Sequence, residues 1–381
     1  MSDPLQNILQ EDIASSDAVL WVADENCSET LLDSLPPHFE ILTNRWGLYQ
    51  YALGRGLSAH FNDFDFSVLA SPKTRIYYRI SKEKPVVHHV IKSSFEALMV
   101  GGKFIVWGEK KSGIKTYTKK ANRLFGCSSQ AKKSASDYVA VLEKSTVAGS
   151  AEDEHDLDDS DYADLRRAIH FGDASLFTKP GLFGWDKVDR GSSLLIEHLS
   201  EFLSGFKARP ESVLDMGCGY GLLTVATAEQ GIADITAVDN CAAALLACEK
   251  NMRELCQVSY KNFIESRAGS GPHAAEFKGR IVAADCRPAY ADNFDQEVNQ
   301  QFDAVLCNPP FHQGFDTERE LTEAFVMTAA RQLKRRGQAL FVTNRFVGLE
   351  KIAQDFFSEV TILAENREFR LTVMKHKKHR L

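Results

Sequence analysis

The chain has 381 residues, of which 44% are hydrophobic and 25% are charged, and its formal net charge is −7. This length accommodates two domains of ordinary size, and the composition is that of a soluble globular protein. No apolar run approaches the roughly 20 residues that span a bilayer, and the N-terminus lacks the pattern of a signal peptide. The eight cysteines contain no Cys-x-x-Cys pair. We therefore expect reduced thiols, no metal site and a cytoplasmic location.

Residues 1–145 alternate between predicted strands, at 19–23, 39–43, 66–70 and 103–107, and helices, one of them at about 87–99. Such alternation predicts a doubly wound parallel sheet. Ten Lys or Arg residues against three acids gather in 101–145. Basic clusters of this kind bind phosphate backbones, although a solvated face is the equally good alternative. Our candidate RNA-binding residues are Lys110, Lys111, Lys115, Lys119, Lys120 and Arg123.

Residues 151–164 contain eight acids and no Lys or Arg. The segment has few large apolar residues with which to pack, so we interpret 146–165 as an exposed acidic linker between two domains. The alternative is the solvated start of an acidic helix.

The strongest motif begins where a short apolar run reaches Asp215 and is followed by Gly217, Gly219 and Gly221. This pattern predicts the strand, tight turn and helix start of a cofactor site. A dinucleotide site would read Gly-x-Gly-x-x-Gly and favour a pyrophosphate. An acid before the turn would repel phosphate and suits the cationic S-adenosylmethionine. The alternative is an ordinary glycine-rich turn.

Two further predicted strands end in acids. Asp239 follows 20 residues after Gly219, a distance that suits one helix and a return strand, and it is placed to accept the ribose hydroxyls of an adenosine. Asp285 ends the next strand and is placed to accept from an adenine amino group. The predicted cofactor-binding residues are Asp215, Gly217, Cys218, Gly219, Gly221, Asp239, Asn240, Asp285, Cys286 and Asn308.

The fourth strand of this half, near 302–307, leads into Asn308-Pro309-Pro310-Phe311. The Asn308 side-chain oxygen and the Pro309 carbonyl can accept both hydrogens of a planar NH₂ group, and Phe311 offers a stacking face. We predict these four residues as the catalytic loop. A simple Asn-Pro turn is the alternative.

The chain ends with two predicted strands, 360–364 and 369–374, only about four residues apart. Parallel neighbours need a crossover of a dozen or more residues, so this pair must be an antiparallel hairpin. A parallel sheet finished in this way is the topology of Class I methyltransferases rather than of nicotinamide oxidoreductases.

The N-terminal half reads as a second copy of the C-terminal half. Aligning 67–72 with 304–309 puts Ser71 in the place of Asn308, and the copy lacks the glycine turn. We therefore predict an α/β protein of two tandem Class I (Rossmann-like) domains. These are a degenerate domain at 1–145 for RNA binding or support, the linker at 146–165, and a catalytic domain at 166–381.

Several motifs resemble one family. They are 179–183 (Lys-Pro-Gly-Leu-Phe), 189–192 (Asp-Arg-Gly-Ser), 214–219, 308–312 and, in the degenerate copy, 106–113. Together they resemble the bacterial ribosomal RNA guanine-N2 methyltransferases of the RsmC and RlmG type over nearly the whole chain. The resemblance implies methyl transfer from S-adenosylmethionine to a guanine N2 amine in 16S ribosomal RNA, with 23S ribosomal RNA as the alternative. It also implies that Phe183, Asp189, Gly191, Ser192 and His312 close over the cofactor or the base.

Other functions remain open at this point. The same loop chemistry serves an adenine amine in DNA or a glutamine amide in a protein, although neither explains the duplicated domain. A non-catalytic RNA-binding assembly factor with a methyltransferase fold is the alternative from another class. Our expected partner is ribosomal RNA in an assembled or assembling small subunit, with no membrane and no metal.

Overall fold

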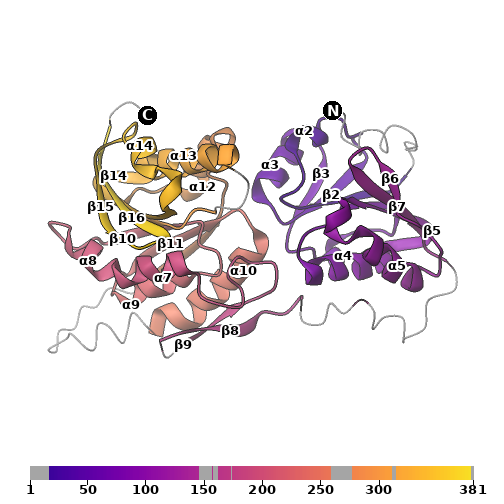
Figure 1. The fold of residues 1–381 in the computed structure, drawn as a ribbon, viewed down its shortest axis with the longest axis horizontal. Helices are drawn as coiled ribbons and strands as arrows, with labels where there is room; N and C mark the ends of the chain where they lie inside the picture. The colour runs from indigo at the N-terminus through magenta and orange to yellow at the C-terminus, as the bar shows by residue number, and fades with distance from the viewer. Residues whose placement is uncertain are drawn as a thin grey trace. The chain divides into compact units, whose positions relative to one another are not determined.

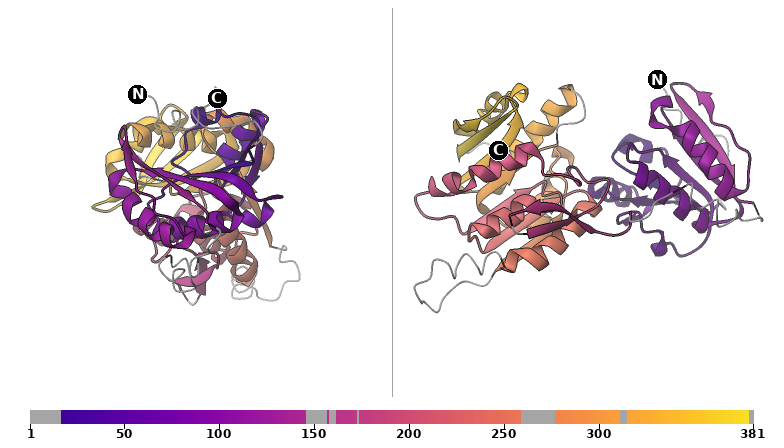
Figure 2. Two further views of the ribbon diagram at one scale, coloured as in Figure 1. Left: turned by 90° about the vertical axis from the view of Figure 1, so that its right-hand side faces the viewer. Right: turned by 60° about the horizontal axis from the view of Figure 1, so that its bottom comes forward.

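The computed structural model describes residues 17–145, 157, 162–172, 174–258, 277–310 and 315–378, with the side chains of 315–318 left out. The chain divides into two compact units, Met1–Asp164 and Leu165–Leu381. Each unit contains a seven-stranded sheet with helices on both faces (Figures 1 and 2).

The first unit alternates strands and helices throughout. Its strands are β1 (Val19–Ala23), β2 (Phe39–Thr43), β3 (Ser58–Phe61), β4 (Lys73–Arg79), β5 (Leu98–Gly108), β6 (Lys132–Ser134) and β7 (Asp137–Glu143). Its α-helices are α2 (Glu29–Leu32), α3 (Trp46–Gly54), α4 (Lys84–Ala97) and α5 (Ile114–Phe125), and short 3₁₀ turns lie at Phe66–Val68 and Lys110–Ser112. The strand order is β3-β2-β1-β4-β5-β7-β6.

The second unit opens with a separate hairpin of β8 (Arg166–Phe171) and β9 (Ala174–Thr178). Its main sheet contains β10 (Ser212–Met216), β11 (Asp234–Asp239), β12 (Lys278–Ala283), β13 (Phe302–Cys307), β14 (Leu333–Asn344), β15 (Phe357–Glu365) and β16 (Phe369–Lys377). The helices are α7 (Arg190–Glu197), α8 (Leu199–Ser204), α9 (Leu222–Glu229), α10 (Ala242–Asn251), α12 (Ala291–Val298), α13 (Phe315–Gln332) and α14 (Leu349–Ala353), with a π-helical turn at Met252–Cys256 and 3₁₀ turns at Pro288–Tyr290 and Arg345–Val347.

The two main sheets have the same topology, which confirms the predicted duplication. The second sheet runs β12-β11-β10-β13-β14-β16-β15, the same arrangement as the first. In each sheet five strands are parallel and the last two add an antiparallel hairpin. The expected terminal hairpin is therefore present as β15 and β16.

Each sheet lies between two apolar layers. In the second unit, α7, α8, α9 and α10 pack against one face and α12, α13 and α14 against the other. In the first unit, α4 and α5 cover one face, and α2 and α3 cover the other. Both faces of a parallel sheet are covered in this way because its crossover helices must bury their apolar stripes. Only the strand ends are left for a site.

One predicted strand is wrong. In place of a strand at 66–70, Phe66–Val68 form a 3₁₀ turn, and Asp65 caps it by accepting from the Ser67 N–H at 2.9 Å. The fourth strand is β4 instead. Its register with β1 pairs Val22 with Tyr78, as β10 pairs Met216 with Cys307 in the second unit. The residue in the place of Asn308 is therefore Arg79, and the predicted equivalence of Ser71 is wrong.

The acidic segment is partly packed where the structure describes it, although Ala163 and Asp164 are exposed. Leu157 and Tyr162 are buried in the core of the first unit, and the Tyr162 hydroxyl donates to Oδ1 of Asp63 at 2.7 Å. Asp63 and Asp285 occupy corresponding positions in the two units. Asp63 lies two residues after Phe61, the β3 partner of Thr43, and Asp285 lies two residues after Ala283, the β12 partner of Asp239. The linker tyrosine therefore covers the acid that corresponds to Asp285. The rest of 146–161, apart from Leu157, lies outside the described residues.

All eight cysteines are free thiols, and six of them are buried. Among the described helices, none has the length and apolarity that crossing a membrane requires. Within the same ranges, no three His, Cys, Asp or Glu side chains converge as a metal site would need.

Candidate active site

The glycine turn joins β10 to α9 through three left-handed residues. Gly217, Gly219 and Gly221 have φ angles of 76°, 53° and 89°. A Cβ at Gly221 would also lie 2.8 Å from the Sγ of Cys248, so a larger residue would collide with α10. Because side chains rarely tolerate positive φ, these positions need glycine to bring the backbone round at the strand end.

Asp215 lies beneath this turn, and one of its two carboxylate oxygens has no described hydrogen-bond donor. It is 1% exposed, and its Oδ2 accepts from Thr224 Oγ1 at 2.6 Å. Its Oδ1 is buried and receives no hydrogen bond from any residue that the structure describes. Burial raises the pKa of this carboxyl from 3.8 to about 7, and the nearby Asp239 adds to the shift. A buried acceptor without a donor fits a ligand that carries an amino group.

Asp239 ends β11 and is locked against the glycine turn. Its Oδ2 accepts from the Gly219 N–H and its Oδ1 from the Cys241 N–H, both at 2.9 Å. These bonds fix the carboxylate at the strand edge, where the sequence predicts contact with ribose hydroxyls.

Asp285 is 2% exposed and forms an ion pair with Arg287. The sequence analysis did not predict Arg287 as a site residue. The guanidinium reaches Oδ2 of Asp285 at 2.7 Å, and Asn240 Nδ2 lies 3.4 Å from the same oxygen. Arg287 also stacks on Tyr290, 5.0 Å from the ring centroid. The predicted adenine acceptor is therefore already engaged by an arginine.

The two predicted cysteines of the cofactor site are buried. Cys218 lies in the glycine turn, and its hydrogen bond with Cys248, together with burial, raises the pKa of its thiol. Cys286 follows Asp285, burial raises the pKa of its thiol, and its carbonyl accepts from Thr328 Oγ1 at 3.0 Å. Thiols with a raised pKa are not reactive thiolates, and the part of both cysteines in the cofactor site stays a prediction.

Asn308 follows β13 and is half-buried. Its Nδ2 donates to Oδ2 of Asp189 and to Oγ of Ser192, both at 2.8 Å. Pro309 is buried and Pro310 is exposed. Phe311 and His312, which the sequence assigns to stacking and closure, lie outside the described residues.

The glycine turn and the Asn308 loop follow neighbouring strands. Met216 of β10 pairs with Cys307 of β13, so the next residues on each strand leave the same edge of the sheet. The strand order reverses between β10 and β13, and such a switch point is where doubly wound sheets bind ligands. The structure thus brings together Asp215, Asp239 and Asn308.

The remaining residues predicted to close over the site have different surroundings. Phe183 is 59% exposed, whereas Asp189 caps the N-terminus of α7 by accepting from the Ser192 N–H at 2.8 Å. Gly191 lies against the Phe369 ring, which a Cβ would approach to 3.3 Å. Asp189, Gly191 and Ser192 therefore belong to a packed helix start.

Asn251 is a second residue that the sequence analysis missed. Its side chain is fully buried, accepts from the Phe177 N–H at 2.7 Å, and donates to the carbonyls of Phe177 and Tyr220 at 2.8 and 2.7 Å. It thereby ties hairpin strand β9 to the glycine turn. No local motif marks this residue, because its partners are 31 and 74 positions away.

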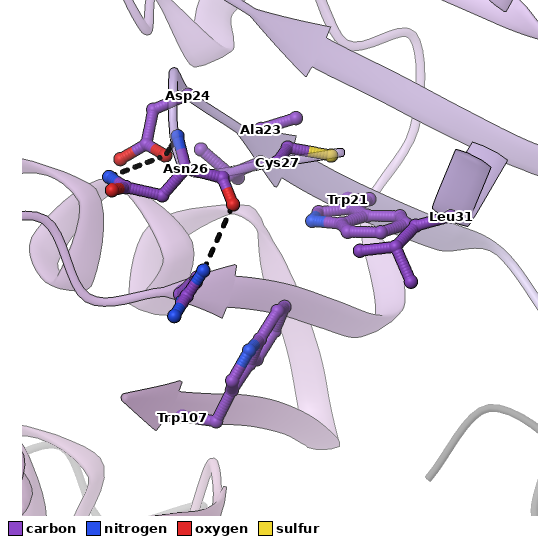
Figure 3. Close-up of a pocket in the computed structure, with 9 residues that line it drawn as sticks. Trp21, Ala23, Asp24, Asn26, Cys27, Leu31 and Trp107 are labelled. Atoms are coloured by element: carbon purple, nitrogen blue, oxygen red, sulfur yellow. Dashed lines mark hydrogen bonds between the residues drawn. The ribbon is translucent and has the colours of Figure 1, made fainter. Parts of the chain in front are cut away.

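The first unit has a small hollow at its corresponding strand ends (Figure 3). The register places Trp21 where the second unit has Asp215. Trp21 and Trp107 fill the space, and the remaining cavity of about 10 Å³ has room for one water molecule. The Arg79 guanidinium donates to the Asn26 carbonyl across it at 3.1 Å. A nucleoside cannot enter a cavity of this size.

The 3₁₀ turn Lys110–Ser112 and helix α5 present the predicted basic residues to solvent. Lys110, Lys111, Lys115, Lys119 and Arg123 are exposed and Lys120 is half-buried, while the opposite face of α5 packs into the core. Lys115, Lys119 and Arg123 are spaced by four residues and therefore lie in one row.

A protein-family profile described as "Methyltransferase small domain" matches residues 173–277 and 273–373. Two relatives named "Ribosomal RNA small subunit methyltransferase C" are each 27% identical to this chain. The one from Cronobacter sakazakii aligns over 89% of this chain and 88% of its own length, and the one from Citrobacter koseri over 90% of each.

Among solved structures, the chain resembles "T. Thermophilus 16S rRNA N2 G1207 methyltransferase (RsmC) in complex with AdoMet and Guanosine". The TM-score is 0.72, with 22% identity over 98% of this chain and 92% of that one. The likeness extends over both units and supports the tandem fold.

Proposed function

Because the chain belongs to the methyltransferase small domain family, we propose that it transfers the methyl group of S-adenosylmethionine to the exocyclic N2 amine of a guanine in 16S ribosomal RNA. The observation that carries the proposal is the pairing of Met216 with Cys307. It sets a buried acid, one of whose oxygens has no described donor, beside an asparagine amide at one sheet edge. The names of the relatives and the guanosine in the similar solved structure support this choice of acceptor.

Three carboxylates are suited to hold the cofactor. Asp215 would accept from the amino group of the cofactor, and Asp239 from its ribose hydroxyls. Asp285 would accept from the adenine amine while sharing its Oδ2 with Arg287. When bound, the cofactor supplies a methyl group activated by a sulfonium. The glycine turn supplies the backbone room for it.

The chain's own part in the reaction is to orient the acceptor. A guanine amine is flat and nearly non-basic because its lone pair is delocalised. Asn308 Oδ1 and the Pro309 carbonyl accept its two hydrogens, which turns the nitrogen lone pair towards the methyl group. Catalysis is then positioning and electrostatic stabilisation, and the proton leaves after transfer.

A paired guanine cannot reach a loop at the strand ends, so the base is unpaired or flipped out of its stack. The basic row of α5 binds the surrounding phosphate backbone. The partner is therefore ribosomal RNA in an assembled or assembling small subunit, in the cytoplasm, and the degenerate unit serves RNA binding.

The test is transfer of tritiated methyl groups to purified 30S subunits, 50S subunits and naked 16S RNA, followed by nucleoside analysis. We expect N2-methylguanosine in 16S RNA. Label in 50S subunits alone would move the substrate to 23S RNA. Absence of transfer to every RNA, with cofactor binding intact, would favour a non-catalytic assembly factor.

A further inference from the structure

The side-chain amide of Asn308 is held in a single orientation. Its Nδ2 lies 2.8 Å from Oδ2 of Asp189 and 2.8 Å from Oγ of Ser192. A carboxylate accepts hydrogen bonds and cannot donate them, so the amide group that faces Asp189 is NH₂. The carbonyl oxygen Oδ1 is on the other arm of the amide and points away from Asp189. No described residue donates to this oxygen.

Asp189 is itself fixed by the start of α7. The same Oδ2 accepts from the Ser192 N–H at 2.8 Å, and a Cβ on the intervening Gly191 would lie 3.1 Å from it and 3.3 Å from the Phe369 ring. Glycine at 191 therefore allows the helix start to approach β16 closely. Asp189 and Ser192 reach Asn308 from a packed helix end, not from a mobile loop.

We propose that Asp189 and Ser192 are positioning residues that select the orientation of Asn308 required for methyl transfer. The inference rests on the proposed function and names the residues that set the geometry of its site. With Nδ2 bound by two acceptors, Oδ1 is the atom left to accept from the guanine amine. In the reversed orientation Oδ1 would face the Asp189 carboxylate, and Nδ2 would face the N–H groups of the substrate; both contacts are repulsive.

The role of Asp189 is tested by the variant Asp189→Asn, which keeps the volume and the capacity to cap a helix. Because one oxygen of Asp189 accepts from both the Ser192 N–H and Asn308, an amide here either keeps both bonds through its oxygen or turns its NH₂ towards Asn308 and gives up the cap. Both orientations of Asn308 therefore become possible. We expect kcat about 10- to 100-fold lower, because displacement of an aligned group costs factors of this size. The Kd for S-adenosylmethionine and the KM for RNA should change less than about twofold.

Two serines of α7 provide a graded comparison. Ser192→Ala removes one of the two acceptors and should lower kcat by less than Asp189→Asn does. Ser193→Ala is the matched control, because the Ser193 hydroxyl donates to the Asp189 backbone carbonyl at 3.0 Å and leaves Asn308 alone. It should keep the wild-type kcat.

A reciprocal exchange separates orientation from structural support. Asn308→Asp sets two carboxylates against each other and should leave little activity. Adding Asp189→Asn provides an N–H donor for the new carboxylate, whose other oxygen takes the place of Oδ1. The double variant should be at least about tenfold more active than Asn308→Asp alone, a gain that loss of structural support cannot produce.

The assay uses tritiated S-adenosylmethionine and 30S subunits, and the side-chain amide signal of Asn308 in ¹⁵N NMR gives a readout that needs no RNA. That signal should shift in Asp189→Asn and Ser192→Ala and stay in place in Ser193→Ala. An inactive wild-type protein would overturn the proposed function and leave the NMR test of the orientation in force. A wild-type kcat in Asp189→Asn, an effect on KM alone, no gain in the double variant, or an unshifted signal would overturn the inference.

Discussion

Asp215 carries the clearest electrostatic signature of any residue at the site. Its carboxyl is buried between β10 and α9, with Thr224 as the partner of one oxygen and no described partner for the other. Burial raises its pKa to about 7, so near neutral pH it changes between a proton-bound and an ionised form. A cationic amino group binds the ionised form and releases the proton.

This predicts a pH dependence of cofactor binding. Below pH 7 the Asp215 carboxyl retains its proton and cannot pair with the amino group. The Kd for S-adenosylmethionine should therefore rise as the pH falls, approaching about tenfold per pH unit. Calorimetric titrations at pH 6, 7 and 8 measure this slope. Asp215→Asn should bind more weakly at pH 8 and lose the slope, and an unchanged slope in that variant would contradict the assignment.

The same shift affects the stability of the cofactor-free protein. The folded state binds the Asp215 proton more tightly than the unfolded state, whose carboxyl has a pKa near 3.8. This contribution to stability is complete below pH 3.8 and is lost as the pH rises to 7. Guanidinium unfolding at pH 5 and pH 8 measures the free energy of unfolding of both proteins. The difference between Asp215→Asn and the wild type should shift in favour of the variant as the pH rises, by an amount on the order of a few kcal/mol.

Asn308 is the residue on which turnover should depend most directly. Asn308→Ala removes the acceptor oxygen without touching the glycine turn or the three carboxylates. We expect kcat to fall by at least about 10²-fold, the typical cost of losing one polarising contact. Calorimetric affinity for S-adenosylmethionine should stay within about threefold of the wild type. Near wild-type turnover would exclude Asn308 from the reaction.

At the scale of elements, regular strands were predictable and irregular segments were not. The predicted strands 19–23 and 39–43 coincide with β1 and β2, because continuous β-branched and aromatic runs are typical of strands buried on both faces. The run at 66–70 has the same composition, yet Asp65 caps it as a 3₁₀ turn. The true strand, β4, was missed because it begins with basic residues before Ile76, Tyr77 and Tyr78.

The site divides in the same way. The sequence places Asp215, Asp239 and Asn308 correctly at strand ends, because parallel strands carry their C-terminal residues to one edge. Their roles remain predictions. Asn251 was missed, since side-chain contacts across many residues leave no periodic signal. Arg287 lies only two residues after its partner Asp285, and it was missed because no motif marks that pair. Asp189 caps α7, a role that the sequence did not predict, and its closure over the ligand stays a prediction.

The segment 146–165 contributes to the stability of the first unit through Tyr162. The Tyr162 ring is 2% exposed, its centroid lies 4.8 Å from that of His89, and its hydroxyl donates to Asp63. Tyr162→Ala should lower the free energy of unfolding by about 3 kcal/mol or more, as truncation of a buried aromatic residue does. Tyr162→Phe keeps the ring and should cost only about 1 kcal/mol. Urea unfolding followed by tryptophan fluorescence distinguishes them, because Trp21, Trp46 and Trp107 report on this unit.

An unchanged midpoint in Tyr162→Ala would mean that the segment does not hold this unit together. A drop of equal size in both variants would assign the effect to the hydrogen bond instead of the ring.

At the scale of the whole molecule, the two copies of the fold differ at their switch points. Both units have the same strand order. At its switch point the second has glycines and an acid with one oxygen that no described residue contacts, whereas the first has Trp21 and a cavity for one water. The first unit also presents the basic row of α5. A unit with a filled pocket and a cationic surface is suited to bind the RNA on which the other unit acts.

This division predicts that binding and chemistry can be impaired separately. Lys115→Glu/Lys119→Glu replaces two exposed cations one helical turn apart and leaves the buried face of α5 unchanged. Affinity for 16S RNA should fall at least about tenfold. The slope of log K against log salt should become shallower by about 0.7 to 0.9 for each lost phosphate contact. Filter binding at several salt concentrations measures both, and affinity for S-adenosylmethionine should be unchanged.

The control is Lys207→Glu/Lys278→Glu, which changes the net charge equally at two exposed positions, one just before β10 and one at the start of β12, at the opposite edge of the catalytic sheet from Asn308. If RNA is attracted only by overall charge, both pairs should weaken binding alike and keep the same salt slope. If α5 contacts the phosphate backbone directly, the slope should change in the α5 pair alone. Equal effects would therefore remove RNA recognition from the degenerate unit and leave structural support as its role.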